Sequence, residues 1–231
     1  MIPLKDDNPI SIFPFVTITF IAANVLIFFY QFSLGEGLNL FIYNFGAVPY
    51  LITNPHEAPP EIYTPAYLTL FTSMFLHGGW MHLIGNMLYL WIFGNNIEDQ
   101  LGHIGFIAFY LGCGLLATAA HIMTDPSSKI PTVGASGAIS GVLGAYLIRF
   151  PRARVLTLIW FGFFVRMVHL PALVFLGFWI MLQLLYGLPT LGAQSGGGVA
   201  YFAHIGGFAA GVGLFVLMRL LMGKRTRPNS F

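Results

Sequence analysis

Charged side chains are scarce in this 231-residue chain, in which Asp, Glu, Lys and Arg together make up 8% of the residues. A soluble domain carries about 25% charged residues. Hydrophobic residues make up 57% of the chain, and its mean hydropathy is +0.78. This composition excludes an ordinary soluble domain. We expect a multi-pass membrane protein whose surroundings are the lipid bilayer, with no nucleic acid as a partner.

Cysteine is nearly absent as well. The single Cys113 lies inside an apolar run, so there is no disulfide framework, and the residue is expected to serve packing. The first residues carry Lys5, Asp6 and Asp7 without the small-residue cleavage site of a signal peptide. The first apolar segment is therefore expected to remain as a membrane anchor.

The chain contains no Asp or Glu after Asp125. None of its Asp residues lies within a predicted span, so an intramembrane aspartyl protease, which needs two Asp residues there, is excluded. A zinc protease of the H-E-x-x-H type has little support, because the only adjacent His-Glu pair, His56-Glu57, lacks the second histidine. No metal site and no cofactor are predicted.

Apolar segments bounded by charge or by turn residues predict an all-α membrane protein with a single domain over residues 1–231. A short polar lead precedes the first span. The long loop 35–65 is expected to be functional or to be docked on another part of the protein. The run 155–165 is too short to cross and is expected to form an interfacial or re-entrant loop. Glu98 and Asp99 close the second span and are expected to solvate a helix end. Six spans are predicted: 13–32, 80–97, 104–123, 136–149, 171–186 and 203–221.

Basic residues are distributed unevenly between the two sides of this bundle. Nine Lys and Arg residues fall on the side of the two termini and only Lys129 falls on the other. Basic residues favour the cytoplasmic side. Both termini are therefore predicted to be cytoplasmic, and the expected location is a bacterial cytoplasmic membrane.

A serine between glycines opens the fourth predicted span, in the sequence Gly134-Ala135-Ser136-Gly137. Small residues then recur every four positions, a pattern that allows two membrane helices to approach closely. Two interpretations remain open from this stretch alone. The pattern serves helix packing, or Ser136 is a nucleophile at the start of a tightly packed central helix.

Polar residues inside other spans lie at a similar depth. Counted to the charged residue at the cytoplasmic end of each span, Ser136, Asn86, His82 and His204 stand 13, 12, 16 and 15 residues away. At the rise of an α-helix, all four lie roughly 18–24 Å above that boundary. Intramembrane polar residues are functional candidates by default. Each histidine alone is also compatible with a hydrogen bond that only holds helices together.

Taken together, these motifs resemble the rhomboid intramembrane serine proteases. The resemblance rests on the pair His82-xxx-Asn86, on Gly134-Ala135-Ser136-Gly137, and on Ala203-His204 before a glycine-rich helix, in this order on spans 2, 4 and 6. It implies a six-span rhomboid-like bundle with a short central helix 4 that carries the serine. It also implies that Ser136 is the nucleophile, His204 the general base, and Asn86 and His82 the oxyanion site. Span 5 and the glycine-rich loop after it would gate and cap the cavity.

The chain departs from the family pattern in two places. Some rhomboids carry a Trp-Arg pair in the first long loop, whereas this loop has no Arg. Many rhomboids carry an aromatic residue one turn after the serine, packed on the imidazole, whereas here that position is Ser140. A nearby aromatic such as Tyr201 would have to take its place. Because no carboxylate is available at this depth, the composition permits only a Ser–His dyad, without the acid of a soluble triad.

Two functions follow as alternatives. The first is an endopeptidase that cuts single-span membrane proteins within or beside their membrane segments. The second is a non-catalytic member of the family that binds membrane helices as a scaffold or chaperone. The presence of both Ser136 and His204 favours the first, since a non-catalytic protein has no need of a nucleophile and a base.

Overall fold

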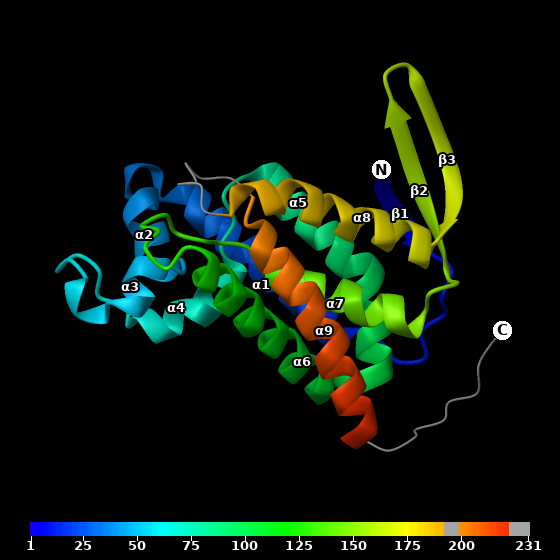
Figure 1. The fold of residues 1–231 in the computed structure, drawn as a ribbon, viewed down its shortest axis with the longest axis horizontal. Coiled ribbons are helices and arrows are strands. Elements are labelled where there is room, and N and C mark those ends of the chain that lie inside the picture. The colour runs from blue at the N-terminus through cyan, green and yellow to red at the C-terminus, as the bar shows by residue number, and fades with distance from the viewer. Residues whose placement is uncertain (192–198, 222–231) are drawn as a thin grey trace.

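The computed structural model describes residues 1–191 and 199–221. The glycine-rich loop 192–198, expected to cap the cavity, and the basic residues of 222–231 lie outside the described residues. The chain opens with strand β1, and helix α1 follows; a hairpin of two strands separates the later helices (Figure 1). The elements are β1 Ile2–Asp6, α1 Phe15–Ser33, α2 Leu38–Phe45, α3 Pro49–Thr53, α4 Ala66–Thr72, α5 Trp80–Tyr89, α6 Asn95–Thr124, α7 Ser136–Arg149, β2 Arg154–Phe161, β3 Phe164–Pro171, α8 Ala172–Gly187 and α9 Tyr201–Leu221.

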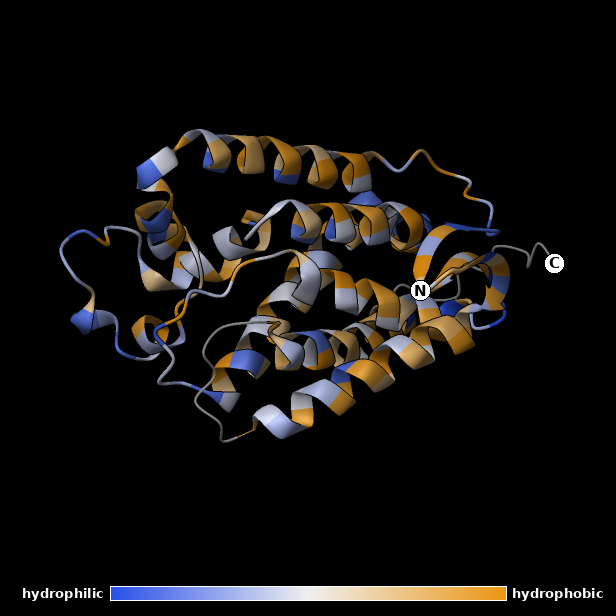
Figure 2. Ribbon diagram, turned by 90° about the horizontal axis from the view of Figure 1, so that it is seen from above, coloured by the Kyte–Doolittle hydropathy of each residue, from blue (hydrophilic) through white to orange (hydrophobic). Residues whose placement is uncertain are grey.

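Four helical stretches of the described chain are long and apolar enough to cross a membrane: Phe15–Ser33, Trp80–Thr124, Ala172–Thr190 and Tyr201–Leu221. Figure 2 shows hydrophobic residues along most of the helical ribbons and hydrophilic ones mainly in the connections. The second stretch contains both predicted spans 80–97 and 104–123. Its backbone departs from helical geometry at Gly102, where φ is 72° and ψ is 168°. Glycine adopts this conformation at no steric cost, so the chain changes direction between the two predicted spans.

Helix α7 is the most enclosed helix of the bundle. Every residue from Gly137 to Tyr146 is buried. Helices α6 and α9 pack against it, and α9 crosses in front of α7 in Figure 1. With 14 residues, α7 is about 21 Å long, which is less than the roughly 30 Å of a hydrocarbon core.

Glycines allow α7 and α9 to touch backbone to backbone. A Cβ atom added at Gly207 would overlap the carbonyl oxygen of Gly137, and one added at Gly211 would overlap that of Gly141. The distances from the added Cβ atoms to these oxygens are shorter than the contacts that Cβ atoms make in proteins. The stripe of small residues in the sequence therefore does serve helix packing, and this packing also sets the height of each helix against the other.

The prediction of an all-α protein was wrong in one respect, because residues 2–6 and 154–171 form a three-stranded antiparallel sheet in the order β1-β2-β3. Val155 and Thr157 alternate with more exposed neighbours and are buried, as expected of a strand. Gly162, with φ of 57°, begins the two-residue connection to β3. The run 155–165 is thus half of a hairpin that extends away from the helices (Figure 1).

Glu98, which was expected to solvate a helix end, does so while fully buried. Its side chain is 0% exposed, and its carboxylate accepts the backbone N–H groups of Val16 and Thr17, each at 2.8 Å. The first N–H groups of a helix have no partner within the helix and attract negative charge. Glu98 therefore caps the N-terminus of α1. Asp99 likewise accepts the backbone N–H groups of Ser11 and Ile12.

The contact between α7 and α9 leads to a first prediction, for the pair Gly211→Ala and Gly213→Ala. Gly211→Ala should lower the free energy of unfolding by about 1–3 kcal/mol, because its methyl group has no space beside Gly141. Gly213→Ala is the matched control on the same helix, with nothing within 4 Å of an added Cβ. It should be neutral or stabilising, since Ala favours helix more than Gly does. Thermal unfolding of both purified variants measures the difference, and equal stabilities would contradict this account.

Candidate active site

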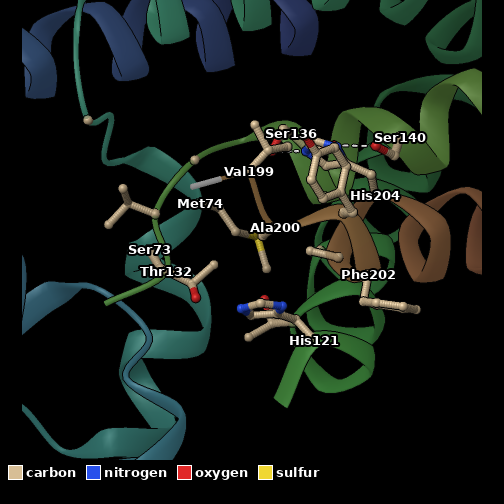
Figure 3. Close-up of a pocket in the computed structure, with 18 of the residues that line it drawn as sticks. Ser73, Met74, His121, Thr132, Ser136, Ser140, Val199, Ala200, Phe202 and His204 are labelled. Carbon is tan, nitrogen blue, oxygen red and sulfur yellow. Dashed lines mark hydrogen bonds between the residues drawn. The ribbon is translucent and has the colours of Figure 1, made fainter. Parts of the chain in front are cut away.

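Ser136 is the first residue of α7, and its hydroxyl lies 2.9 Å from Nε2 of His204. His204 belongs to the first turn of α9, three residues before Gly207. Ser136 directly precedes Gly137, on whose backbone Gly207 packs. The glycine contacts between the two helices therefore bring the hydroxyl and the imidazole together. Figure 3 shows the pair side by side at the cavity wall.

The second ring nitrogen of His204 is held by a residue that the sequence analysis missed. Nδ1 lies 2.8 Å from Oε1 of Gln183 on α8. An amide oxygen only accepts hydrogen bonds, so Nδ1 carries the ring hydrogen and Nε2 is free to accept the proton of Ser136. Gln183 is the only amide side chain within span 171–186. Because a polar residue inside a membrane span is a candidate for a functional role, the sequence alone could have pointed to Gln183.

An aromatic residue from α8 also contacts the imidazole. The ring centres of Trp179 and His204 are 5.9 Å apart, and Trp179 stacks on Phe208 at 6.2 Å. Tyr201, named above as one aromatic residue that could take this role, pairs instead with Tyr186. The Ser140 hydroxyl turns back to the carbonyl oxygen of Ser136 at 2.6 Å, so it does not contact the imidazole.

Asn86 and His82 line the same cavity as Ser136 and His204. Nδ2 of Asn86 lies 2.9 Å from Nε2 of His77, a contact that occupies one of its two amide hydrogens and leaves the other for a further acceptor. The backbone N–H of Gly78 donates to Nδ1 of His82 at 3.4 Å. The ring hydrogen of His82 is then carried by Nε2. Each of the two residues thus retains a donor.

His77 is a second residue that the sequence analysis did not single out. Its side chain is buried, and Gln31 of α1 bonds both its backbone N–H, at 3.0 Å, and its carbonyl oxygen, at 3.2 Å. Burial lowers the pKa of His77 to about 3. The imidazole beside Asn86 is therefore neutral at physiological pH and acts as a fixed support for the amide.

Gly134 brings His82 close to Ser136. Its φ of +127° is a conformation that residues with a side chain rarely adopt. A Cβ atom at this position would lie 2.7 Å from Cε1 and Nε2 of His82 and 3.6 Å from the Ser136 hydroxyl. Only glycine therefore permits this distance between the imidazole and the start of α7.

The segment that leads to Ser136 is fixed by the loop region before α5. Ala47 and Thr132 exchange two backbone hydrogen bonds, at 3.0 and 2.8 Å, and the N–H of Gly134 donates to the carbonyl of Ser73 at 2.9 Å. Of the two expectations for loop 35–65, the docked one is met, because Ala47 pairs with Thr132 in the segment before Ser136. The loop contains the short helices α2 and α3, which the sequence analysis did not predict.

The cavity in front of Ser136 has a volume of about 1200 Å³. Its walls come from α5, α7, the end of α6, the start of α9 and the segment before Ser136. The polar residues His121, near the end of α6, and Asp125 and Lys129, after it, also line the cavity. Within the described ranges, no group of three or more His, Cys, Asp or Glu side chains could hold a metal ion.

The fold and the site define a helical, multi-pass membrane protein with a serine and a histidine paired at a cavity. The Rhomboid domain family matches residues 64–220, which include all four of the predicted site residues. The chain belongs to the rhomboid family.

Several curated proteins are similar to this chain. RHOMBOID-like protein 5 of Arabidopsis thaliana is 33% identical over 153 residues, which cover 65% of this chain and 44% of the relative. Rhomboid protein 1, mitochondrial, of Saccharomyces cerevisiae is 28% identical over 155 residues, covering 65% and 41%. Rhomboid protease GluP of Bacillus subtilis is 34% identical over 135 residues, covering 58% and 24%. The matches thus span less than half of each of these relatives.

These relatives come from a plant, from mitochondria and from a bacterium. They give no support to a bacterial cytoplasmic membrane over an organelle membrane. The chain is a multi-pass membrane protein, and its compartment stays a prediction.

Proposed function

We propose that this chain is an intramembrane serine endopeptidase that hydrolyses peptide bonds in or near the membrane segments of single-span proteins. The observation that carries the proposal is the distance of 2.9 Å between the Ser136 hydroxyl and Nε2 of His204 at the wall of a large cavity. A serine hydroxyl is a weak nucleophile until a base accepts its proton. Family membership and relatives that are named proteases, such as GluP and YdcA of Bacillus subtilis, support the same reaction.

In the first step, the Ser136 oxygen attacks the scissile carbonyl carbon while His204 takes the hydroxyl proton at Nε2. The imidazolium then gives this proton to the leaving amine, and an acyl-enzyme remains. Water repeats the sequence with His204 as base and releases the second product. No cofactor enters either half of the reaction.

The negative oxygen that forms during attack needs donors already in place. We assign this role to the free amide hydrogen of Asn86, to Nε2–H of His82 and to the backbone N–H of Ser136. The last of these is one of the first N–H groups of α7, which have no partner within the helix. All three donors are neutral, and they lie on two different elements that face one cavity.

We further propose that the chain crosses the membrane six times. The break at Gly102 would divide Trp80–Thr124 into two crossings, and the short α7 would be the fourth. Because α7 does not reach through the whole hydrocarbon core, water could reach Ser136 through the polar end of the cavity.

The alternative function is a non-catalytic scaffold or chaperone that binds membrane helices. It requires the same fold and the same cavity, but no reactive serine. A serine-directed fluorophosphonate probe separates the two functions, because it forms a covalent bond only with an activated hydroxyl.

Ser136→Ala and His204→Ala should each abolish cleavage of a model single-span substrate and labelling by a fluorophosphonate, while the protein stays folded. The reason is that one variant lacks the nucleophile and the other lacks the base. Gly213→Ala serves as a control that alters neither helix contact nor chemistry. Near-normal turnover by either alanine variant in pure form would refute the dyad.

Asn86→Ala should lower kcat by roughly 10²-fold with little change in KM, because an oxyanion donor acts mainly in the transition state. Asn44→Ala is a matched control: Asn44 is equally buried in α2, but it bonds the backbone of Leu40, Glu61 and Tyr63. It should lower thermal stability and leave kcat unchanged. If Asn86→Ala behaves like Asn44→Ala, Asn86 has only a structural role.

The excess of basic residues leads to a prediction of orientation. A C-terminal reporter that functions only in the cytoplasm should be active, and one that functions only on the opposite side should be silent. The reverse pattern would turn the cavity toward the cytoplasm and contradict the proposed topology.

A further inference from the structure

We propose that Gln183 is a positioning residue for the catalytic base: its amide oxygen, supplied by α8, fixes the tautomer and the orientation of His204. The inference rests on the proposed serine protease function and adds a third member to the Ser–His pair. Its basis is the distance of 2.8 Å between Oε1 of Gln183 and Nδ1 of His204.

Gln183 occupies the position that a carboxylate holds in soluble serine proteases. There, the acid keeps the imidazole in the tautomer with hydrogen on Nδ1 and stabilises the imidazolium. In this chain no Asp or Glu follows Asp125, so no carboxylate is available from α7, α8 or α9. A neutral amide supplies the same acceptor without placing a charge in a region of low dielectric, where an unpaired charge is very costly. Papain-like proteases also pair their histidine with an amide.

The amide of Gln183 has a defined orientation. Its Nε2 donates to the carbonyl oxygen of Trp179, one turn earlier on α8, at 3.4 Å. This contact directs Oε1 toward His204. The indole of Trp179 lies beside the imidazole and stacks on Phe208. Gln183 and Trp179, four residues apart on one face of α8, therefore both fix the ring of His204. Gln183 accepts the hydrogen of Nδ1, and the indole of Trp179 packs against the imidazole ring.

Helix α8 is largely exposed around Gln183. Between Gly177 and Tyr186 none of its residues is buried. Among the described residues, the bond between Gln183 and His204 is the only side-chain hydrogen bond that joins α8 to α7 or α9. The base is therefore fully positioned only while α8 lies against α9. Displacement of α8 would leave Nδ1 without its acceptor and allow the unproductive tautomer.

The first test compares three substitutions on α8. Gln183→Met keeps the length of the side chain but lacks a strong acceptor, and it should lower kcat by about 10²-fold, the low end of what a positioned base contributes, with little change in KM. Gln183→Glu retains an oxygen at the same position, and its kcat should lie well above that of the methionine variant. Leu185→Met, at an exposed position of the same helix, is the control and should behave as wild type.

The second test reads the tautomer directly and does not depend on activity. In ¹⁵N-histidine-labelled protein, with His204 assigned by comparison with His204→Ala, the signal of Nδ1 should be that of a protonated nitrogen and Nε2 that of an unprotonated one. In Gln183→Met the two signals should shift toward a mixture of tautomers. A purely structural role for Gln183 would not produce this change.

The outcomes separate the two proposals. If Ser136→Ala or His204→Ala retains activity, the proposed protease function fails. If activity depends on Ser136 and His204 but Gln183→Met keeps the wild-type kcat and the wild-type tautomer, only the role of Gln183 fails. Should the methionine variant not fold, wild-type protein with hydrogen on Nε2 of His204 would overturn the inference by itself.

Discussion

The geometry of the site depends on one contact, the backbone approach of α7 and α9 through their glycines. Gly207 lies on the carbonyl of Gly137 and Gly211 on that of Gly141, so neither helix can slide along the other without a steric clash or a gap. Membrane helices gain little from the hydrophobic effect when they associate, and close packing replaces it. Ser136 and His204 lie at the ends of this contact. If one helix shifted along the other by one residue, the hydroxyl would move by about 1.5 Å relative to the imidazole.

A second constraint is the low dielectric around the pair. Three side chains nearest Ser136 and His204 are neutral: the amide of Gln183, the indole of Trp179 and the amide of Asn86. The buried charge of Glu98 lies elsewhere in the bundle. Glu98 is buried at the opposite end of the bundle, where helix N–H groups and His103 surround its carboxylate. The buried carboxylate of Glu98 is thus surrounded by hydrogen-bond donors, whereas the groups closest to Ser136 and His204 are neutral dipoles.

Sequence reasoning reached the residues whose signal is local. The spacing of small residues in α7, the shared depth of four polar residues, and the family motifs indicated which side chains line one cavity. Gln183 and Trp179 were missed because the search for a third member looked for a carboxylate, and the search for an aromatic looked one turn after Ser136. The bond between Gln183 and His204 joins residues 21 positions apart on different helices, and no local pattern encodes it. The sheet was missed for a related reason. A short apolar run fits a strand as well as an interfacial loop, and its partner β1 lies about 150 residues earlier, as in the pairing of Ile2 with Leu158.

The position one turn after the serine connects these observations. With Ser140 there, α7 carries no aromatic group that could support the imidazole, and the Ser140 hydroxyl is already committed to the carbonyl of Ser136. Support for His204 therefore has to come from another element, and α8 is the one whose side chains reach both ring nitrogen and ring surface. The site consequently draws on three helices, with Ser136 on α7, His204 on α9, and Gln183 and Trp179 on α8. At this level α8 is the least enclosed of the three helices, so the groups that hold the His204 ring come from the helix with the fewest buried residues around it.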